Sequence, residues 1–405
     1  MKGYFNPGIA YILVWCLYSL QGAFYTSGGI ISQTLIALLL IWSIYYCLII
    51  NFNSDEALPA FIKAVNVFLI MATIYGVILI ASGQELTITE GEYRRVPNFH
   101  YLKEILTSLL PLYPIYYYVK KSYITERHLV LLLLIFIGVT WSQYFRFQSE
   151  AIENALTYGY TREEFTNNTG YTFLAILPLL LLWNKKPILQ YILFLVCIAG
   201  IILCMKRGAI IIGAICAIYF IYQTFKMTRG PKKITIILLS ILAIWYTVWL
   251  VRDMLVTSEY FGQRLEATLE GDSSNRDIIF NNLWNVFISE TNPLIILFGR
   301  GANATLSVGM NLAHNDWLEL AINQGFLGVI IYIIYFTSLL SDAHRVRKTN
   351  SLNASVLYMA FVILFIRSFF SMSYGDINIV LMLAIGLALG TNNNHSTNST
   401  LAPNY

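Results

Sequence analysis

"GIISQTLIALLLIWSIYYCLII", residues 29–50, contains no charged side chain. As a helix it would be about 33 Å long at ~1.5 Å per residue, enough to cross the roughly 30 Å hydrocarbon core of a bilayer. Similar apolar runs recur along the 405 residues, which are 57% hydrophobic and only 12% charged, with a mean hydropathy of +0.62. Soluble domains carry about 25% charged residues. The composition therefore predicts an all-α, polytopic integral membrane protein.

Hydropathy predicts about twelve transmembrane helices. We expect nine of them within residues 1–250, a long outer loop with short helices over 251–324, three more spans within 325–390, and a disordered cytoplasmic tail in the Asn-rich segment 391–405. The expected spans are 8–24, 29–50, 62–82, 104–118, 129–147, 170–184, 188–205, 208–226, 233–250, 325–341, 354–373 and 376–390.

Basic residues predict the orientation of these spans, because Lys and Arg collect in cytoplasmic loops. With both termini inside, the short basic cytoplasmic connections are 119–128, 184–187, 226–233 and 342–348. The longer outer connections are 83–103, 148–169 and 251–324. Cations on the expected inner side are mostly Lys, whereas those on the outer side are nearly all Arg, whose planar donors match phosphate and carboxylate. This bias favours an outer ligand that carries phosphate or many negative charges; drift in composition is the alternative.

Metal and redox chemistry have no motif in the sequence. All five cysteines lie in apolar runs and lack the spacing of a metal or redox motif: Cys16, Cys47, Cys197, Cys204 and Cys216. We expect them to be small core side chains. The outer loop shows no acidic metal-binding pair, and the chain shows no serine-hydrolase motif. The expected chemistry uses neither a metal nor a cofactor.

The outer loop contains two arginine candidates. In "SSNRDIIFNNLWNVFISE" the helical spacing predicts an apolar face of Phe280, Leu283, Trp284 and Phe287. Ser274 is the expected cap, which puts Arg276 at a helix start, where backbone N–H groups already favour anions. A solvated loop arginine is the alternative. Arg300 follows in a short Gly-Arg-Gly turn whose spacing matches no nucleotide-binding loop.

The segment 309–328, "GMNLAHNDWLELAINQGFLG", gathers polar residues before an apolar run. Asp316 and Glu319 have the spacing of a capping box, so a helix should begin there. His314 and Asn315 would then lie at its positive end, and this field should lower the pKa of the imidazole and favour its neutral form. A neutral histidine suits general-base catalysis. A histidine hydrogen-bonded into a loop is the alternative.

A third cationic site is Lys206–Arg207, in a very short turn between two expected spans on the outer side. Positive charge is disfavoured on that side. The pair either reaches lipid headgroups or faces the interior and holds an anion, and we favour the anion. Arg367, within an apolar run, is similarly costly unless it lines a cavity.

These segments resemble a known family, the bacterial O-antigen polymerase and O-antigen ligase superfamily of membrane glycosyltransferases. The residues that carry the resemblance are "KRGAI", "NRDIIFNNLW…NPLIILFGRG" and "AHNDWLELAINQGFLG", mainly within residues 200–330. The resemblance implies a GT-C-like helical fold in the bacterial inner membrane with its active site facing the periplasm. It also implies a donor glycan on undecaprenyl pyrophosphate, bound by Arg207 and Arg276, with His314 as the base. From charge and position we add Arg300 and Lys206 as pyrophosphate ligands, and Asn315 and Glu319 as supporting residues.

Within that family, the run "FGRGAN…AHNDWLELAINQGFLG" is more similar to polymerases of O-antigen or a related surface polysaccharide. The chain's expected partners are a lipid-linked oligosaccharide donor, a glycan acceptor, membrane lipid and other polysaccharide-assembly proteins, but no nucleic acid. A ligase that transfers the polymer to lipid A–core is the first alternative. A flippase of lipid-linked glycans is the second, although transporters usually place their ionisable residues at the bilayer midplane.

Overall fold

The computed structural model describes residues 6–21, 28–52, 57–84, 86–88, 94–124, 126–158, 167–257, 276–309, 312–371 and 379–398. These residues are almost entirely helical. The chain divides into two compact units. Unit 1 comprises Met1–Ile41, Ile115–Asp272 and Asn393–Tyr405, and unit 2 comprises Trp42–Pro114 and Ser273–Asn392. The described part of the expected outer loop is divided between the units, since residues 251–257 belong to unit 1 and residues 276–309 and 312–324 to unit 2.

Six helices in the described part of the chain are long and apolar enough to cross a membrane. They are α2 (Ile30–Phe52), α3 (Ala60–Ser82), His128–Glu150 within α6 (Glu126–Tyr158), α9 (Arg207–Met227), Pro231–Trp249 within α10 (Pro231–Thr257), and α15 (Asp316–Arg347). Shorter apolar helices are α1 (Pro7–Ser19), α7 (Thr169–Leu182), α8 (Pro187–Leu203), α16 (Ser351–Arg367) and the first part of α17 (Ile379–Asn398). The prediction of a helical, membrane-embedded protein is confirmed at this level.

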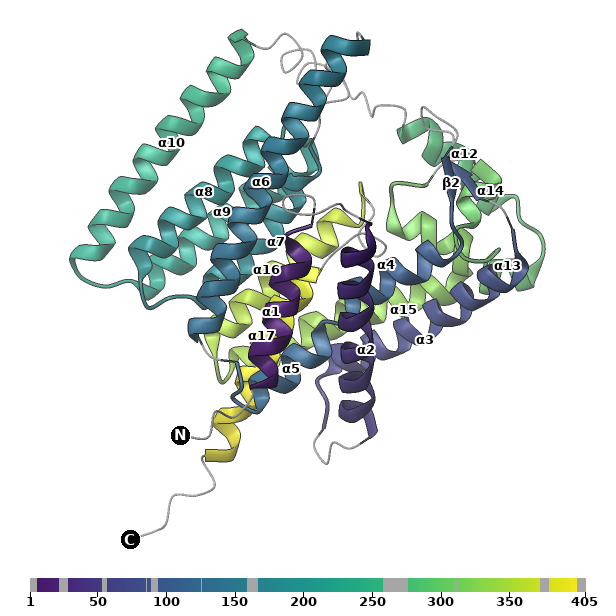
Figure 1. Cartoon of the computed structure of the whole chain (residues 1–405), viewed down its shortest axis with the longest axis horizontal. Coiled ribbons are helices and arrows are strands. Elements are labelled where there is room, and N and C mark those ends of the chain that lie inside the picture. The colour runs from purple at the N-terminus through teal and green to yellow at the C-terminus, as the bar shows by residue number, and fades with distance from the viewer. Residues whose placement is uncertain are drawn as a thin grey trace. The chain divides into compact units, whose positions relative to one another are not determined.

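Unit 1 is organised around α7, which packs against α6, α8 and α9 (Figure 1). Residues Gly170 to Leu181 of α7 are almost all buried, so this helix is the core of the unit. α8 comes close to α7 at Gly200, where an added Cβ would lie 2.5 Å from the ring of Phe173. α10 packs on α8 and is largely exposed along its apolar length.

Unit 2 is organised around α15, which packs against α3 and α16 along its length (Figure 1). The backbone N–H of Phe61, at the start of α3, donates to the Asp342 carboxylate of α15 at 2.8 Å. Three short helices contact the first part of α15: α12 (Arg276–Ile288), α13 (Pro293–Phe298) and α14 (Ala304–Gly309). The N-terminal part of α15 is therefore surrounded by the segment expected to form the outer loop.

Asparagine side chains begin several of these helices. Asn6, Asn292, Asn315 and Asn350 each lie at an N-cap, and each accepts a hydrogen bond from a backbone N–H of the first turn. Such a bond satisfies one of the donors that a helix start leaves unpaired. α1 and α13 also have proline at the first helical position, where the missing N–H costs nothing.

The structure corrects the expected helix pattern at one span. The expected span 104–118 is two helices, α4 (Phe99–Leu109) and α5 (Leu112–Lys120), separated at Leu110 and Pro111, because Pro111 has no backbone N–H to continue the hydrogen bonds of α4. One short strand pair accompanies the helices of this all-α fold. β1 (Leu86–Ile88) and β2 (Arg94–Val96) form an antiparallel pair with Leu86 opposite Val96, and Leu86 is buried where β1 contacts α14.

Other expectations are met in part. Leu283 of α12 is buried and Phe287 is partly buried, but Phe280 and Trp284 are 37% and 44% exposed, so the expected apolar face is not a core face throughout. Ser274, the expected cap of this helix, lies outside the described residues. α17 continues to Asn398, through the first residues of the expected tail 391–405.

Candidate functional site

The candidate site of unit 2 is built around a kink in α15. Gly325 has φ 64° and ψ −160°, a conformation that essentially only glycine adopts. An added Cβ at Gly325 would lie 2.5 Å from the backbone of Leu297. Gly299 approaches the other side of the kink equally closely, since its Cβ would lie 2.4 Å from the backbone of Asn323. Two glycines therefore let the segment after α13 pack directly on the backbone of α15.

This close approach is held by backbone hydrogen bonds. The carbonyls of Ile322 and Asn323 accept the N–H groups of Arg300 and Gly301, each at 2.9 Å. The Gly-Arg-Gly turn is thus a structural element that docks on the kink.

The residue next to the kink is also fixed. Gln324 is buried and donates from Nε2 to the hydroxyl of Tyr101 on α4 at 2.6 Å. Burial raises the pKa of Tyr101 and outweighs the hydrogen bond from Gln324, which lowers it, so the hydroxyl stays protonated at neutral pH. The kink is therefore packed on both sides.

A buried carboxylate organises the first turns of α15. Glu319 is fully buried and accepts hydrogen bonds from the backbone N–H of Ala313 at 2.7 Å, from Nδ2 of Asn323 at 2.9 Å, and from the hydroxyl of Thr305. Asn323 in turn accepts the backbone N–H of Thr305 at 3.2 Å. Glu319 therefore ties α14 and the residue just before His314 to α15.

The start of α15 differs from the expected capping box. The cap is Asn315, whose Oδ1 accepts the N–H of Leu318 at 3.1 Å. Asp316 is buried inside the helix bundle, where its Oδ2 accepts the hydroxyl of Tyr332 at 2.6 Å. Glu319 bonds to Ala313 instead of closing the box with Asp316. The spacing predicted the helix start to within one residue. The carboxylates of Asp316 and Glu319, however, form hydrogen bonds with other partners and do not cap the helix.

The turn after α16 braces this helix start. Asp316 donates its N–H to the carbonyl of Ser368 at 2.9 Å, and Trp317 donates from Nε1 to the Ser368 hydroxyl at 3.0 Å. Asn315 donates from Nδ2 to the carbonyl of Phe369 at 2.9 Å. The turn after α16 thus fixes Asn315, which lies directly beside His314 in the chain.

Arg276 reaches the same turn. Its Nη1 donates to the carbonyl of Phe370 at 2.5 Å, one residue beyond the carbonyl that binds Asn315. Arg276 is the first residue of α12 and is half-buried. Two of the predicted site residues, 39 positions apart in the sequence, therefore bind adjacent carbonyls.

His314 lies directly before the cap of α15, with φ 50°, in the left-handed region that few non-glycine residues adopt. Its side chain is half-buried and interacts electrostatically with the buried Glu319. Strained backbone of this kind occurs more often at functional sites than elsewhere. The placement of His314 at the helix start agrees with the sequence prediction.

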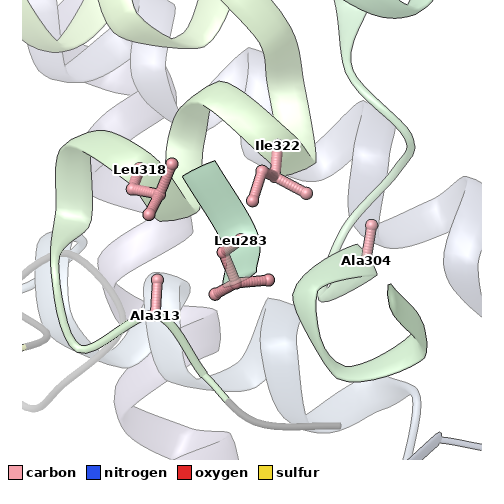
Figure 2. Packing of buried hydrophobic residues seen from close by; sticks show 5 residues of the cluster. All are labelled: Leu283, Ala304, Ala313, Leu318 and Ile322. Carbon is pink, nitrogen blue, oxygen red and sulfur yellow. The ribbon is translucent and has the colours of Figure 1, made fainter. Parts of the chain in front are cut away.

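A small apolar core packs against the segment that carries His314. Leu283 of α12 points among Ala304, Ala313, Leu318 and Ile322, and all five are buried (Figure 2). The packing is close, because an added Cβ at the end of α14, on Gly309, would lie 2.7 Å from Leu283. The core joins the arginine-bearing helix to the histidine-bearing loop.

Arg300 has a different environment from Arg276. Its guanidinium forms an ion pair with Glu290, whose side chain is only 11% exposed. Glu290 also accepts the N–H groups of Thr291 and Asn292, at 3.0 and 2.9 Å. Arg300 thus has a structural partner, and its role in binding pyrophosphate stays a prediction.

Lys206 and Arg207 belong to unit 1. Lys206 is the N-cap residue of α9 and Arg207 its first residue, and only Cys204 to Lys206 separate α8 from α9. Arg207 lines a cavity of about 510 Å³ among α8, α9 and α10. Among the described residues that line it, Arg207 is the only charged one; most others are aliphatic, such as Ile198, Ile211 and Val248.

Sequence reasoning missed the residues that hold Glu319. Asn323 lies four positions after Glu319, a spacing that places two side chains on one helix face and could have revealed the pair. Thr305 and the turn at Ser368 carry no local signal.

No group of three or more His, Cys, Asp and Glu side chains in the described part of the chain is arranged to hold a metal ion.

Comparison of the sequence with protein-family models gives no match. Comparison with curated proteins also gives no match.

Proposed function

We propose that this chain is a polymerase of O-antigen or a related surface polysaccharide, with about twelve spans and a GT-C-like fold in the bacterial inner membrane. It transfers a growing glycan from undecaprenyl pyrophosphate to a hydroxyl of the next lipid-linked repeat unit, on the periplasmic side. The observation that carries the proposal is the helix start of α15, where Arg276 and Asn315 bind adjacent carbonyls beside the strained His314. The resemblance in the same segments supports it.

The proposed reaction is a single displacement. The acceptor hydroxyl attacks the anomeric carbon of the donor sugar while its proton passes to the imidazole of His314. The bond from that carbon to the pyrophosphate oxygen breaks, and the pyrophosphate leaves with the electron pair. Arg276, in the same unit as His314, holds the developing negative charge, and Arg207 is proposed separately as a contact of the donor phosphates, so an already activated leaving group needs no further cation. Glu319 and Asn315 position the histidine through Ala313 and the helix cap.

The apolar cavity of unit 1 supports a lipid-linked donor. Its aliphatic walls suit an isoprenoid chain, and the guanidinium of Arg207 suits the phosphates at the end of that chain. A soluble sugar nucleotide would gain little from such walls, because its groups are polar.

His314→Ala tests the proposal directly. General-base catalysis contributes roughly 10²–10⁴-fold, so transfer from a purified lipid-linked donor should fall by at least about 10²-fold, while thermal stability stays within a few degrees. His344→Ala is the matched control, because His344 lies near the other end of α15 and is exposed. Near-normal turnover of the His314 variant would remove the base from the mechanism.

Arg276→Lys and Arg207→Lys test the proposed leaving-group contacts. Lysine keeps the charge but loses the planar fork, so each variant should lose about 10²-fold in kcat, whereas Arg347→Lys, at the exposed end of α15, should not. Full activity in both would mean that the pyrophosphate needs only a point charge.

The glycan phenotype of a deletion separates polymerase from ligase and flippase. Single repeat units on the lipid core indicate a polymerase. Polymer stranded on the carrier lipid indicates a ligase. Repeat units that stay on the cytoplasmic side indicate a flippase.

A further inference from the structure

Unit 1 contains a second cavity, of about 240 Å³, where the connection from α7 to α8 meets the connection from α9 to α10. Met227, the last residue of α9, lines it, whereas Arg207 is the first residue of the same helix. A helix of 21 residues is about 31 Å long, so this cavity and Arg207 lie at opposite ends of the helix. The cavity is therefore not part of the proposed transferase site.

The cavity is strongly cationic. Lys185, Arg229 and Lys232 line it, and no carboxylate does so among the described residues of its wall. Two helices also begin beside it: α8 at Pro187, with no side-chain cap, and α10 at Pro231. The N-terminus of a helix carries partial positive charge and N–H donors that bind anions. Three side-chain cations and two helix ends therefore converge on one space.

The inner wall of the cavity is polar and fixed. Gln190 and Thr224 line it and are buried. Gln190 donates from Nε2 to the carbonyl of Leu180 at 2.8 Å, and Thr224 donates to the carbonyl of Phe220 at 2.8 Å. The amide nitrogen of Gln190 carries a second N–H. The buried Gln190 and Thr224, together with the three cationic side chains, match a compact anion with several acceptor oxygens. A phosphate group is such an anion.

The surroundings indicate where that phosphate comes from. Within about two turns of the cavity, α8 exposes Leu189 and Ile192, and α10 exposes Ile234 and Leu238, which is 56% exposed. Such apolar surface belongs in the acyl region of a bilayer, so the cavity lies at the level of the headgroups. A phosphate there is most readily supplied by a lipid.

We propose that this cavity binds the phosphate of an anionic phospholipid headgroup, with the acyl chains against the exposed apolar residues of α8 and α10. This site is separate from the proposed transferase site and does not depend on it. The basic residues would also direct membrane orientation, but that role needs only charge in the loop and no cavity. Position-specific binding therefore distinguishes the two roles.

The test uses the purified full-length chain in a zwitterionic detergent. Native mass spectrometry measures the binding of phosphatidylglycerol, phosphatidylcholine and inorganic phosphate. Phosphatidylglycerol should bind about tenfold more tightly than phosphatidylcholine. Arg229→Gln should remove about tenfold of that affinity, or ~1.4 kcal/mol, whereas Lys121→Gln, an exposed lysine of the same unit outside the cavity, should not change it.

A charge-conserving variant distinguishes binding in the cavity from a general effect of positive charge in the connecting segments. Arg229→Gln combined with Gln223→Arg keeps the number of cations but moves one away from the cavity wall. This variant should bind phosphatidylglycerol as weakly as Arg229→Gln while retaining its membrane orientation, measured by cysteine labelling. Wild-type affinity in this variant, equal binding of the two lipids, or binding of inorganic phosphate in preference to phosphatidylglycerol would each overturn the proposal.

Discussion

Replacing Glu319 by alanine tests whether the buried carboxylate holds the helix start that carries His314. The change removes the acceptor for three donors: the N–H of Ala313, Nδ2 of Asn323 and the hydroxyl of Thr305. Ala313 is 2% exposed and the two side chains are fully buried, so water does not replace the lost acceptor without rearrangement.

The expected loss of stability follows from these donors. A buried donor left without a partner costs about 1–3 kcal/mol. The Thr305 hydroxyl can rotate to another acceptor, but the N–H of Ala313 and the amide of Asn323 are fixed by their backbone and their helix. Two unmet donors, less the desolvation cost that Glu319 no longer incurs, give a destabilisation of about 3 kcal/mol. For a unit of roughly 150–250 residues that corresponds to a fall in Tm of about 6–12 °C.

Thermal unfolding in detergent, followed by tryptophan fluorescence, measures this loss. Glu319→Gln keeps one acceptor oxygen and should lose about 1–2 kcal/mol, roughly half as much. Glu150→Ala is the control, because Glu150 is 56% exposed and its ion pair with Arg146 lies at the surface. In the transferase assay kcat should fall with little change in KM, and glutamine should restore part of it. A Tm within 1 °C of wild type for Glu319→Ala would refute the role of this network.

Three further substitutions test the frame of the site by the same unfolding measurement. Gly325→Ala should destabilise by more than about 3 kcal/mol, because the residue would be strained and its Cβ would meet backbone at 2.5 Å; Gly83→Ala, also at positive φ but with open space around it, should cost only about 1–2 kcal/mol, and equal losses would contradict the close approach. Asn315→Ala should lose about 1–2 kcal/mol, because it removes both the capping oxygen and the Nδ2 donor to the Phe369 carbonyl, whereas Asn315→Asp keeps the capping oxygen and should lose less; unchanged stability of Asn315→Ala would contradict the role of the cap. Arg300→Gln should destabilise by about 1–3 kcal/mol through its ion pair with the mostly buried Glu290, and unchanged stability would free Arg300 for a ligand.

Much of the helical pattern could be predicted from the sequence. Apolar length is a local property, so α2, α3 and α9 begin and end within two residues of the expected limits, and α10 begins two residues before its expected start but continues to Thr257. The prediction was incomplete in two other segments. Pro111 divided an expected span, and the pairing of β1 with β2 depends on a partner strand that hydropathy does not detect.

The candidate site was predictable in its residues but not in its construction. Charge and spacing identified Arg276, His314 and Glu319, because ionisable residues are rare in this chain. They did not reveal that Glu319 would bind Thr305, or that Asp316 would bind Tyr332 inside the bundle. Buried polar groups need partners, but the sequence does not say which partner the fold will bring.

The sequence alone determined that this chain is helical and membrane-embedded, and that polar residues gather before one apolar helix, since these are properties of contiguous segments. Only the tertiary structure decided which side chains meet. Arg276 and Phe370 are 94 residues apart, yet they share the hydrogen bond that places an arginine at the histidine-bearing helix start. Such pairs form because packing buries their donors and acceptors together, and a buried donor without an acceptor is too costly to leave.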